Sequence, residues 1–142
     1  MNTNQPLSQS TLDLFGGEIY RYTRAQAIQD GVLIDITETA REVGFRWPTA
    51  ITAAAWADCV AWSEEDTRRQ VYQDASGRLW DVVWMALNAI RHRPLGNQLE
   101  YSLYRVPRDG HSTEAEPTRL KLVVGPGDDG EPVITILLPG ED

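Results

Sequence analysis

Three β-rich stretches near the end of the chain constrain its fold most. They cover about 99–106, 119–124 and 132–138, and apolar residues alternate with polar ones or cluster as Val, Ile and Leu within them. An acidic loop at 107–118 joins the first two stretches, and a Gly-rich turn at 125–131 joins the last two. Strands that follow one another through short turns predict an antiparallel β-meander.

The preceding segments favour helices. Thr23 followed by Gln26 predicts a capping box for a helix over about 24–30, which Gly31 would end. The β-branched stretch 32–36 predicts a strand.

Three more helices are expected before the meander. Thr37 predicts the cap of a short helix that Gly44 ends, Pro48 predicts the start of a buried helix that reaches Trp62, and Arg78 to His92 predicts an amphipathic helix. A short strand is expected at 71–72. The apolar stripe of the amphipathic helix contains Leu79, Val82, Val83, Ala86 and Ile90.

Helices first and strands last predict an α+β fold, with about four helices packed on a mainly antiparallel sheet of three to five strands. A length of 142 residues fits one domain, which we place at 18–142 after a flexible N-terminal arm at 1–17. The arm contains an apolar patch of Leu12, Leu14 and Phe15, which we expect to dock on its own domain.

The charge balance limits the possible partners. The net charge is −8, from 21 acidic and 13 basic residues, and Lys121 is the only lysine. A chain of this charge repels phosphate, which excludes direct nucleic-acid binding, and attracts a basic or nucleic-acid-binding protein partner. The single cysteine and the lack of a long apolar segment predict a cytoplasmic protein with no membrane span.

The motifs that could carry chemistry are weak. Gly125, Gly127 and Gly130 spell a dinucleotide fingerprint, but Pro132 and a strand follow where a helix N-terminus is required. The motif therefore predicts a hairpin turn. Two His residues without a His-Glu-x-x-His spacing predict no metal site, and we expect no cofactor.

Two residues of the predicted helix at 48–62 raise the question of a catalytic group. Apolar neighbours around Cys59 predict a buried, structural thiol with a raised pKa. A carboxylate at Asp58 in an apolar helix needs a partner, and an Arg bridge is the expected one. The alternative is a general base with a raised pKa.

Two groups of residues are candidates for partner binding. Trp80 and Trp84 lie one turn apart at the edge of the amphipathic helix, where they either pack in the core or, with Arg91, form a partner surface. The second group is acidic and lies in the turn of the last hairpin: Asp128, Asp129 and Glu131.

Four stretches of the sequence resemble a family of plasmid-related bacterial proteins of unknown function. They cover residues 22–35, 45–48, 56–60 and 74–82, and the likeness extends from about Tyr20 to Arg91. This family is carried on plasmids and integrative conjugative elements. The resemblance implies a mobile-element setting and brings no known activity.

We therefore expect a non-enzymatic, acidic interaction protein of a bacterial mobile genetic element. By protein–protein binding it would inhibit a host defence complex, in the manner of anti-restriction or anti-CRISPR proteins. Two alternatives stay open: a DNA mimic that uses the acidic C-terminal half, and an uncharacterised enzyme centred on Asp58.

Overall fold

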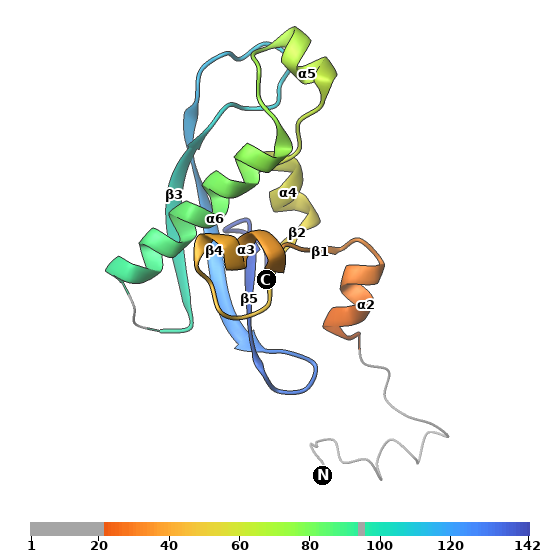
Figure 1. The fold of residues 1–142 in the computed structure, drawn as a ribbon, viewed down its shortest axis with the longest axis vertical. Helices are drawn as coiled ribbons and strands as arrows, with labels where there is room; N and C mark the ends of the chain where they lie inside the picture. Colours follow the sequence, from red (N-terminus) through yellow and green to blue (C-terminus); the bar gives the residue numbers. More distant parts are fainter. Residues whose placement is uncertain (1–21, 94–95) are drawn as a thin grey trace.

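The structure of the chain is a computed structural model that describes residues 22–93 and 96–142, so the predicted arm at 1–17 lies outside the described residues. Figure 1 shows helices and one twisted sheet. The elements follow in this order: α2 (Arg24–Gln29), β1 (Leu33–Asp35), α3 (Thr37–Val43), β2 (Thr49–Thr52), α4 (Ala53–Cys59), α5 (Glu64–Arg69), α6 (Ala75–His92), β3 (Gln98–Arg105), β4 (Glu116–Pro126) and β5 (Pro132–Leu137).

The five strands form one sheet in the order β1–β2–β5–β4–β3. The β3–β4 and β4–β5 pairs are antiparallel, with Tyr101 opposite Leu120 and Leu122 opposite Ile136. This confirms the predicted α+β class and the C-terminal meander. The β2–β5 pair is parallel, with Ile51 opposite Ile136, because β5 inserts between β4 and the earlier strand β2.

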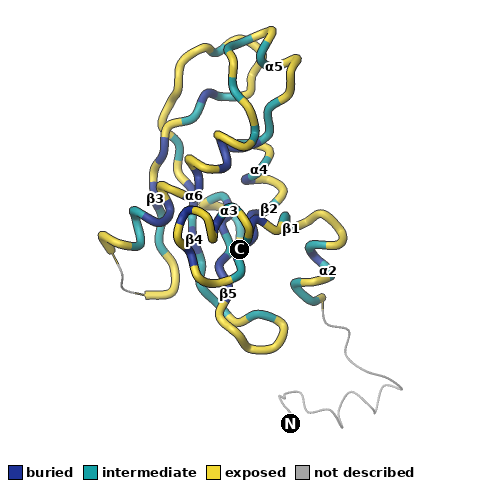
Figure 2. Tube along the Cα trace, in the orientation of Figure 1, coloured by how far each residue is buried: buried dark blue, intermediate teal, exposed yellow. Residues whose placement is uncertain are grey.

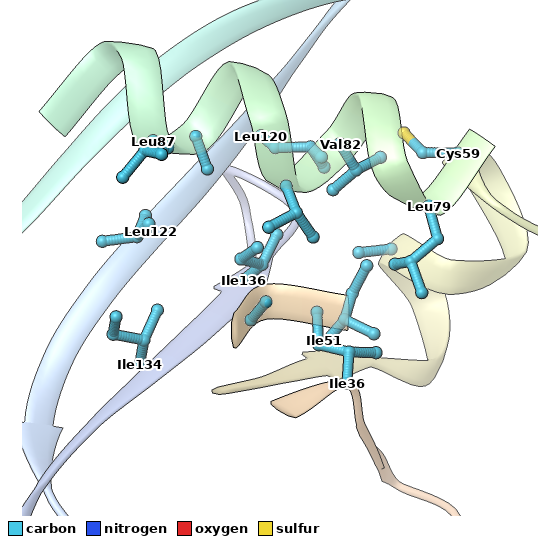
Figure 3. Close-up of a cluster of buried hydrophobic side chains, with 14 of the residues drawn as sticks. Ile36, Ile51, Cys59, Leu79, Val82, Leu87, Leu120, Leu122, Ile134 and Ile136 are labelled. Atoms are coloured by element: carbon cyan, nitrogen blue, oxygen red, sulfur yellow. The ribbon is translucent and has the colours of Figure 1, made fainter. Parts of the chain in front are cut away.

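The core lies between the sheet and helices α3, α4 and α6. Helix α6 crosses one face of the sheet and contacts β3, and α3 packs beside α6 (Figure 1). In Figure 3, Val82 and Leu87 of α6 project toward Leu120 and Leu122 of β4. Each fully buried side chain of this kind stabilises the fold by about 1.5–3 kcal/mol. Figure 2 shows that the buried positions gather along this junction, whereas α5 has no buried residue.

Helix α2 forms where the capping box predicted it. The backbone N–H of Thr23 donates to Gln26 Oε1 at 2.8 Å, and that of Gln26 donates to Thr23 Oγ1 at 3.0 Å. Gly31 follows the helix with φ of +80°, a left-handed conformation that glycine adopts without strain.

The predicted helix at 48–62 is wrong in its first third. Residues Thr49–Thr52 form β2, which pairs with β1 on one side and β5 on the other. Strands on both edges of β2 supply hydrogen bonds to its backbone and bury Ile51. A continuous apolar run is compatible with such a buried strand as well as with a buried helix. Thr52 then caps α4, and Ala53, Ala54 and Ala57 of that helix are exposed.

The predicted strand at 71–72 is also wrong, and helices α5 and α6 lie on either side of these residues. The charged stretch after Ser63 is helix α5, whose capping box joins Ser63 and Asp66. No strand forms at 71–72, and Tyr72 is 76% exposed. Asp74 caps α6, because its carboxylate accepts a hydrogen bond from Gly77 N at 2.7 Å.

Candidate functional site

Helix α6 presents an aromatic face to solvent. Its apolar stripe is buried on the sheet, and Trp80 and Trp84 are each 42% exposed on the other side. Neither tryptophan is therefore a core residue. Arg91 is exposed on the same side of the helix. We call Trp80, Trp84 and Arg91 the tryptophan face.

The helix fixes the spacing of the tryptophan face. Residues four apart lie about 6 Å apart along a helix axis, so Trp80 and Trp84 form one short row. Arg91 lies seven residues beyond Trp84, two turns further along nearly the same line. The 18-residue helix is held on its opposite side by the core, so the row is carried by a rigid element.

One carboxylate accompanies the two tryptophans. Partial burial raises the pKa of Asp81, and attraction to the Arg78 guanidinium opposes this rise. Met85, which follows Trp84, is 37% exposed and extends the apolar surface of the helix. This side of α6 therefore presents two tryptophans and a methionine beside one acid, Asp81, and one arginine, Arg91.

The acidic turn residues lie elsewhere and have intramolecular roles. Asp128 accepts hydrogen bonds from the backbone N–H groups of Arg24 at 2.8 Å and Ala25 at 3.0 Å, so it caps the N-terminus of α2. Glu131 accepts a hydrogen bond from Asp129 N at 3.0 Å. Figure 1 places this hairpin beside α2, and the structure does not join it to the tryptophan face.

The same hairpin settles the glycine motif. Gly127 N donates to Glu131 O at 2.6 Å and Gly130 N donates to Gly127 O at 3.0 Å, which closes a tight turn between β4 and β5. No helix begins after Gly130, so the predicted hairpin turn is confirmed.

Asp58 has the arginine partner that the sequence predicted. Arg105 Nη2 lies 3.1 Å from Asp58 Oδ1, and the Asp58 side chain is 38% exposed. Cys59, the next residue, is buried. Burial raises the pKa of the Cys59 thiol to about 12, and the Asp58 carboxylate adds to the rise.

Arg78 is a buried charge that the sequence analysis missed. Its guanidinium donates to the carbonyl oxygens of Val60 at 3.1 Å and Val106 at 3.0 Å, and to Gln73 Oε1 at 2.6 Å. The group also lies 4.6 Å from the centre of the Trp62 ring. Desolvation lowers its pKa. The sequence feature that could have predicted its burial is its position one turn before Val82, within the buried stripe of the helix.

A second missed feature is an apolar groove of about 520 Å³ at the C-terminal end of α6. Its walls come from the loop after α3, from α6 and from strands β3, β4 and β5, so no local sequence pattern could reveal it. Gly44, with φ of +137°, allows α3 to end against Leu87. The apolar lining comprises Phe45, Trp47, Leu87, Ile90, Leu99, Leu122, Val124 and Ile134.

Residues 22–93 and 96–142 contain no group of three or more His, Cys, Asp or Glu side chains placed to hold a metal ion. Within the same residues, no helix has the length and apolar character needed to cross a membrane.

A model of DUF6573, a family of unknown function, matches residues 14–142. The chain belongs to this family. No curated protein and no solved structure matches the chain. Membership in DUF6573 agrees with the expected family of unknown function, and it adds no activity.

Proposed function

We propose that this chain is a non-enzymatic interaction protein that binds a protein partner through the tryptophan face. The observation that carries the proposal is the exposure of Trp80 and Trp84 in one row on a rigid helix. Large aromatic residues and arginine dominate the binding energy of protein interfaces. An exposed pair held by a packed helix loses little conformational entropy on binding.

The charge of the chain suggests the chemistry of the partner. A net charge of −8 speeds encounter with a basic surface, such as that of a nucleic-acid-binding protein. The tryptophan face would then supply the apolar anchor, and the acidic remainder of the molecule would supply long-range attraction.

The DNA-mimic alternative has less support from the arrangement of the acids. Asp128 caps α2, and Asp109 accepts hydrogen bonds from His111 N at 3.0 Å and Ser112 N at 2.8 Å. A hydrogen bond from the Ser112 hydroxyl, together with the two backbone bonds, holds the pKa of Asp109 well below its usual range. Glu100 pairs with Arg119 at 2.8 Å. Carboxylates used in this way are poorly arranged to imitate a regular row of phosphates.

The ion pair between Asp58 and Arg105 weakens the alternative of an enzyme centred on Asp58. A general base would need a carboxylate that is free to take a proton, whereas Asp58 is ion-paired at 3.1 Å. A structural role accounts for this pair, because Arg105 on β3 thereby ties α4 to the meander.

The setting in which the partner is sought comes from the resemblance to plasmid-related proteins. In that setting we propose that the chain acts in the bacterial cytoplasm for a mobile genetic element. A host defence complex of the restriction or CRISPR type is the proposed target, since such complexes carry basic nucleic-acid-binding surfaces.

The test is a comparison of two double variants of the full chain. Trp80→Ala/Trp84→Ala removes the anchors, and Tyr72→Ala/Tyr104→Ala removes two aromatic side chains that are 76% and 69% exposed elsewhere. Proteins retained from a bacterial lysate are identified by mass spectrometry, and the Kd of a purified retained protein is then measured. We expect the tryptophan variant to weaken binding by about 30-fold or more, which corresponds to about 2 kcal/mol.

The tyrosine variant serves as the matched control and should bind with nearly unchanged Kd. Circular dichroism of both variants checks that α6 is retained. If the tyrosine variant loses the partner while the tryptophan variant keeps it, the proposed surface is wrong.

A further inference from the structure

The apolar groove is a candidate binding site that is separate from the tryptophan face. Its volume of about 520 Å³ lies within the range of about 300–1,000 Å³ that is typical of ligand sites. Ile90, Leu99 and Val124 in its wall are only half-buried, and Trp47 is 43% exposed. An occupant that covered these side chains would remove a large apolar area from water.

We propose that the groove binds the N-terminal segment Leu12–Asp13–Leu14–Phe15 of the same chain. Three apolar side chains of this segment match the apolar lining, and the single acid matches the two arginines that border it, Arg46 and Arg93. Arg93 donates to the Glu100 carbonyl at 2.7 Å. Arg46 makes no hydrogen bond or ion pair with another residue of 22–93 or 96–142, so its charge is available to Asp13.

The chain is long enough to make this contact. Arg24 lies near the start of the described residues, and its Nη2 donates to the Ile134 carbonyl at 2.7 Å. Ile134 also lines the groove, so the first residue of α2 is hydrogen-bonded to a strand that forms one wall of the groove. Phe15 precedes Tyr22 by seven residues. An extended stretch of that length spans about 23–25 Å, which is about five times the spacing of neighbouring strands in a sheet.

The family match covers the second half of the segment. The match to DUF6573 begins at residue 14, so it includes Leu14, Phe15 and every residue of the groove, whereas Leu12 and Asp13 precede it. The apolar residues Leu14 and Phe15 of the N-terminal arm are explained if the domain itself buries them.

The experiment uses the full chain with a spin label at Thr11→Cys. Cys59 is buried and its pKa is raised to about 12, so we expect the label to attach only to the new thiol. The wild-type chain treated with the same label is the control, because it should remain unlabelled. Amide cross-peak intensities in a ¹⁵N-labelled sample report proximity to the label. We expect the largest loss of intensity at Gly44, Phe45, Asn97, Gln98 and Leu99.

Two variants make the result specific. Leu14→Asp/Phe15→Asp and, separately, Arg46→Glu should restore the intensities at the groove, because each removes one part of the proposed match. Arg46 is exposed, and Leu14 and Phe15 lie outside residues 22–93 and 96–142, which contain the core. The cross-peak pattern of the core should therefore be preserved.

Three results would overturn the inference. One is a loss of intensity centred on the tryptophan face, and another is a loss at the groove that the Leu14→Asp/Phe15→Asp variant leaves unchanged. The third uses a mixture of ¹⁵N-labelled wild type with the spin-labelled, unenriched Thr11→Cys variant. A loss of intensity at the groove of the wild type in this mixture would show that the occupant comes from a second copy of the chain.

Discussion

The Arg78 guanidinium joins three separate parts of the chain at one point. It reaches the carbonyl of Val60 after α4, the side chain of Gln73 before α6 and the carbonyl of Val106 after β3. Its Nη2 atom has no hydrogen-bond partner among residues 22–93 and 96–142. A shorter apolar side chain here would leave two carbonyls without these donors, and each buried unpaired group costs about 1–3 kcal/mol. Arg78 is therefore a structural residue with a positive charge.

Cys59 provides a prediction at the same scale. Because the thiolate is the reactive form and burial raises the pKa to about 12, thiol reagents should modify native Cys59 very slowly at neutral pH. Labelling should become fast in denaturant, when the residue reaches water and its ordinary pKa returns. The measurement is the rate of thiol labelling with and without denaturant. Fast labelling of the folded chain at neutral pH would show that the residue is reactive and that its structural role is wrong.

At the scale of secondary structure, α2 depends on a residue far away in the sequence. Asp128 supplies its carboxylate to the first turn of a helix that begins 104 residues earlier. We expect Asp128→Ala to reduce the free energy of unfolding by about 1 kcal/mol, the usual loss for a helix cap. The measurement is the midpoint of urea unfolding.

Asp129→Ala is the matched control for this cap. The two aspartates are neighbours in one turn, but only Asp128 receives the α2 amides, so Asp129→Ala should change stability by less than about 0.5 kcal/mol. Equal effects of the two substitutions would contradict the cap. The comparison also separates stability from recognition, because a partner that reads the charge of the turn would respond to Asp129.

The elements that could be predicted are those with local signals. The Thr23–Gln26 capping box, the apolar stripe of α6 and the alternation in the meander each specify a structure within a few residues. Residues 49–52 lack such a signal, because a short apolar run suits a buried strand as well as a buried helix. The parallel pairing of β2 with β5 joins residues more than 80 positions apart, and no local pattern encodes it.

The candidate sites divide in the same way. The tryptophan face lies on one helix, so its spacing could be read from the chain. The apolar groove and the Arg78 contacts each combine several segments, so they depend on how the elements pack.

At the scale of the whole molecule, the net charge of −8 leads to a prediction about nucleic acid. Binding to duplex DNA gains most of its free energy when Lys and Arg displace counterions from phosphates, and this chain carries an excess of acids. We expect no mobility shift of duplex DNA at an ionic strength of about 0.15 M. A retained complex under these conditions would argue against the proposed function, because the chain would then have a nucleic-acid partner of its own.

The position of β5 has a consequence for how the chain is made. In the order β1–β2–β5–β4–β3, the central strand is the one that the ribosome produces after all the others. Until β5 has emerged, the β1–β2 pair and the β3–β4 hairpin share no strand, and the apolar stripe of α6 lacks part of the surface that covers it. The nascent chain therefore exposes apolar surface until β5 emerges, which makes it a candidate for chaperone binding before a single insertion step completes the sheet.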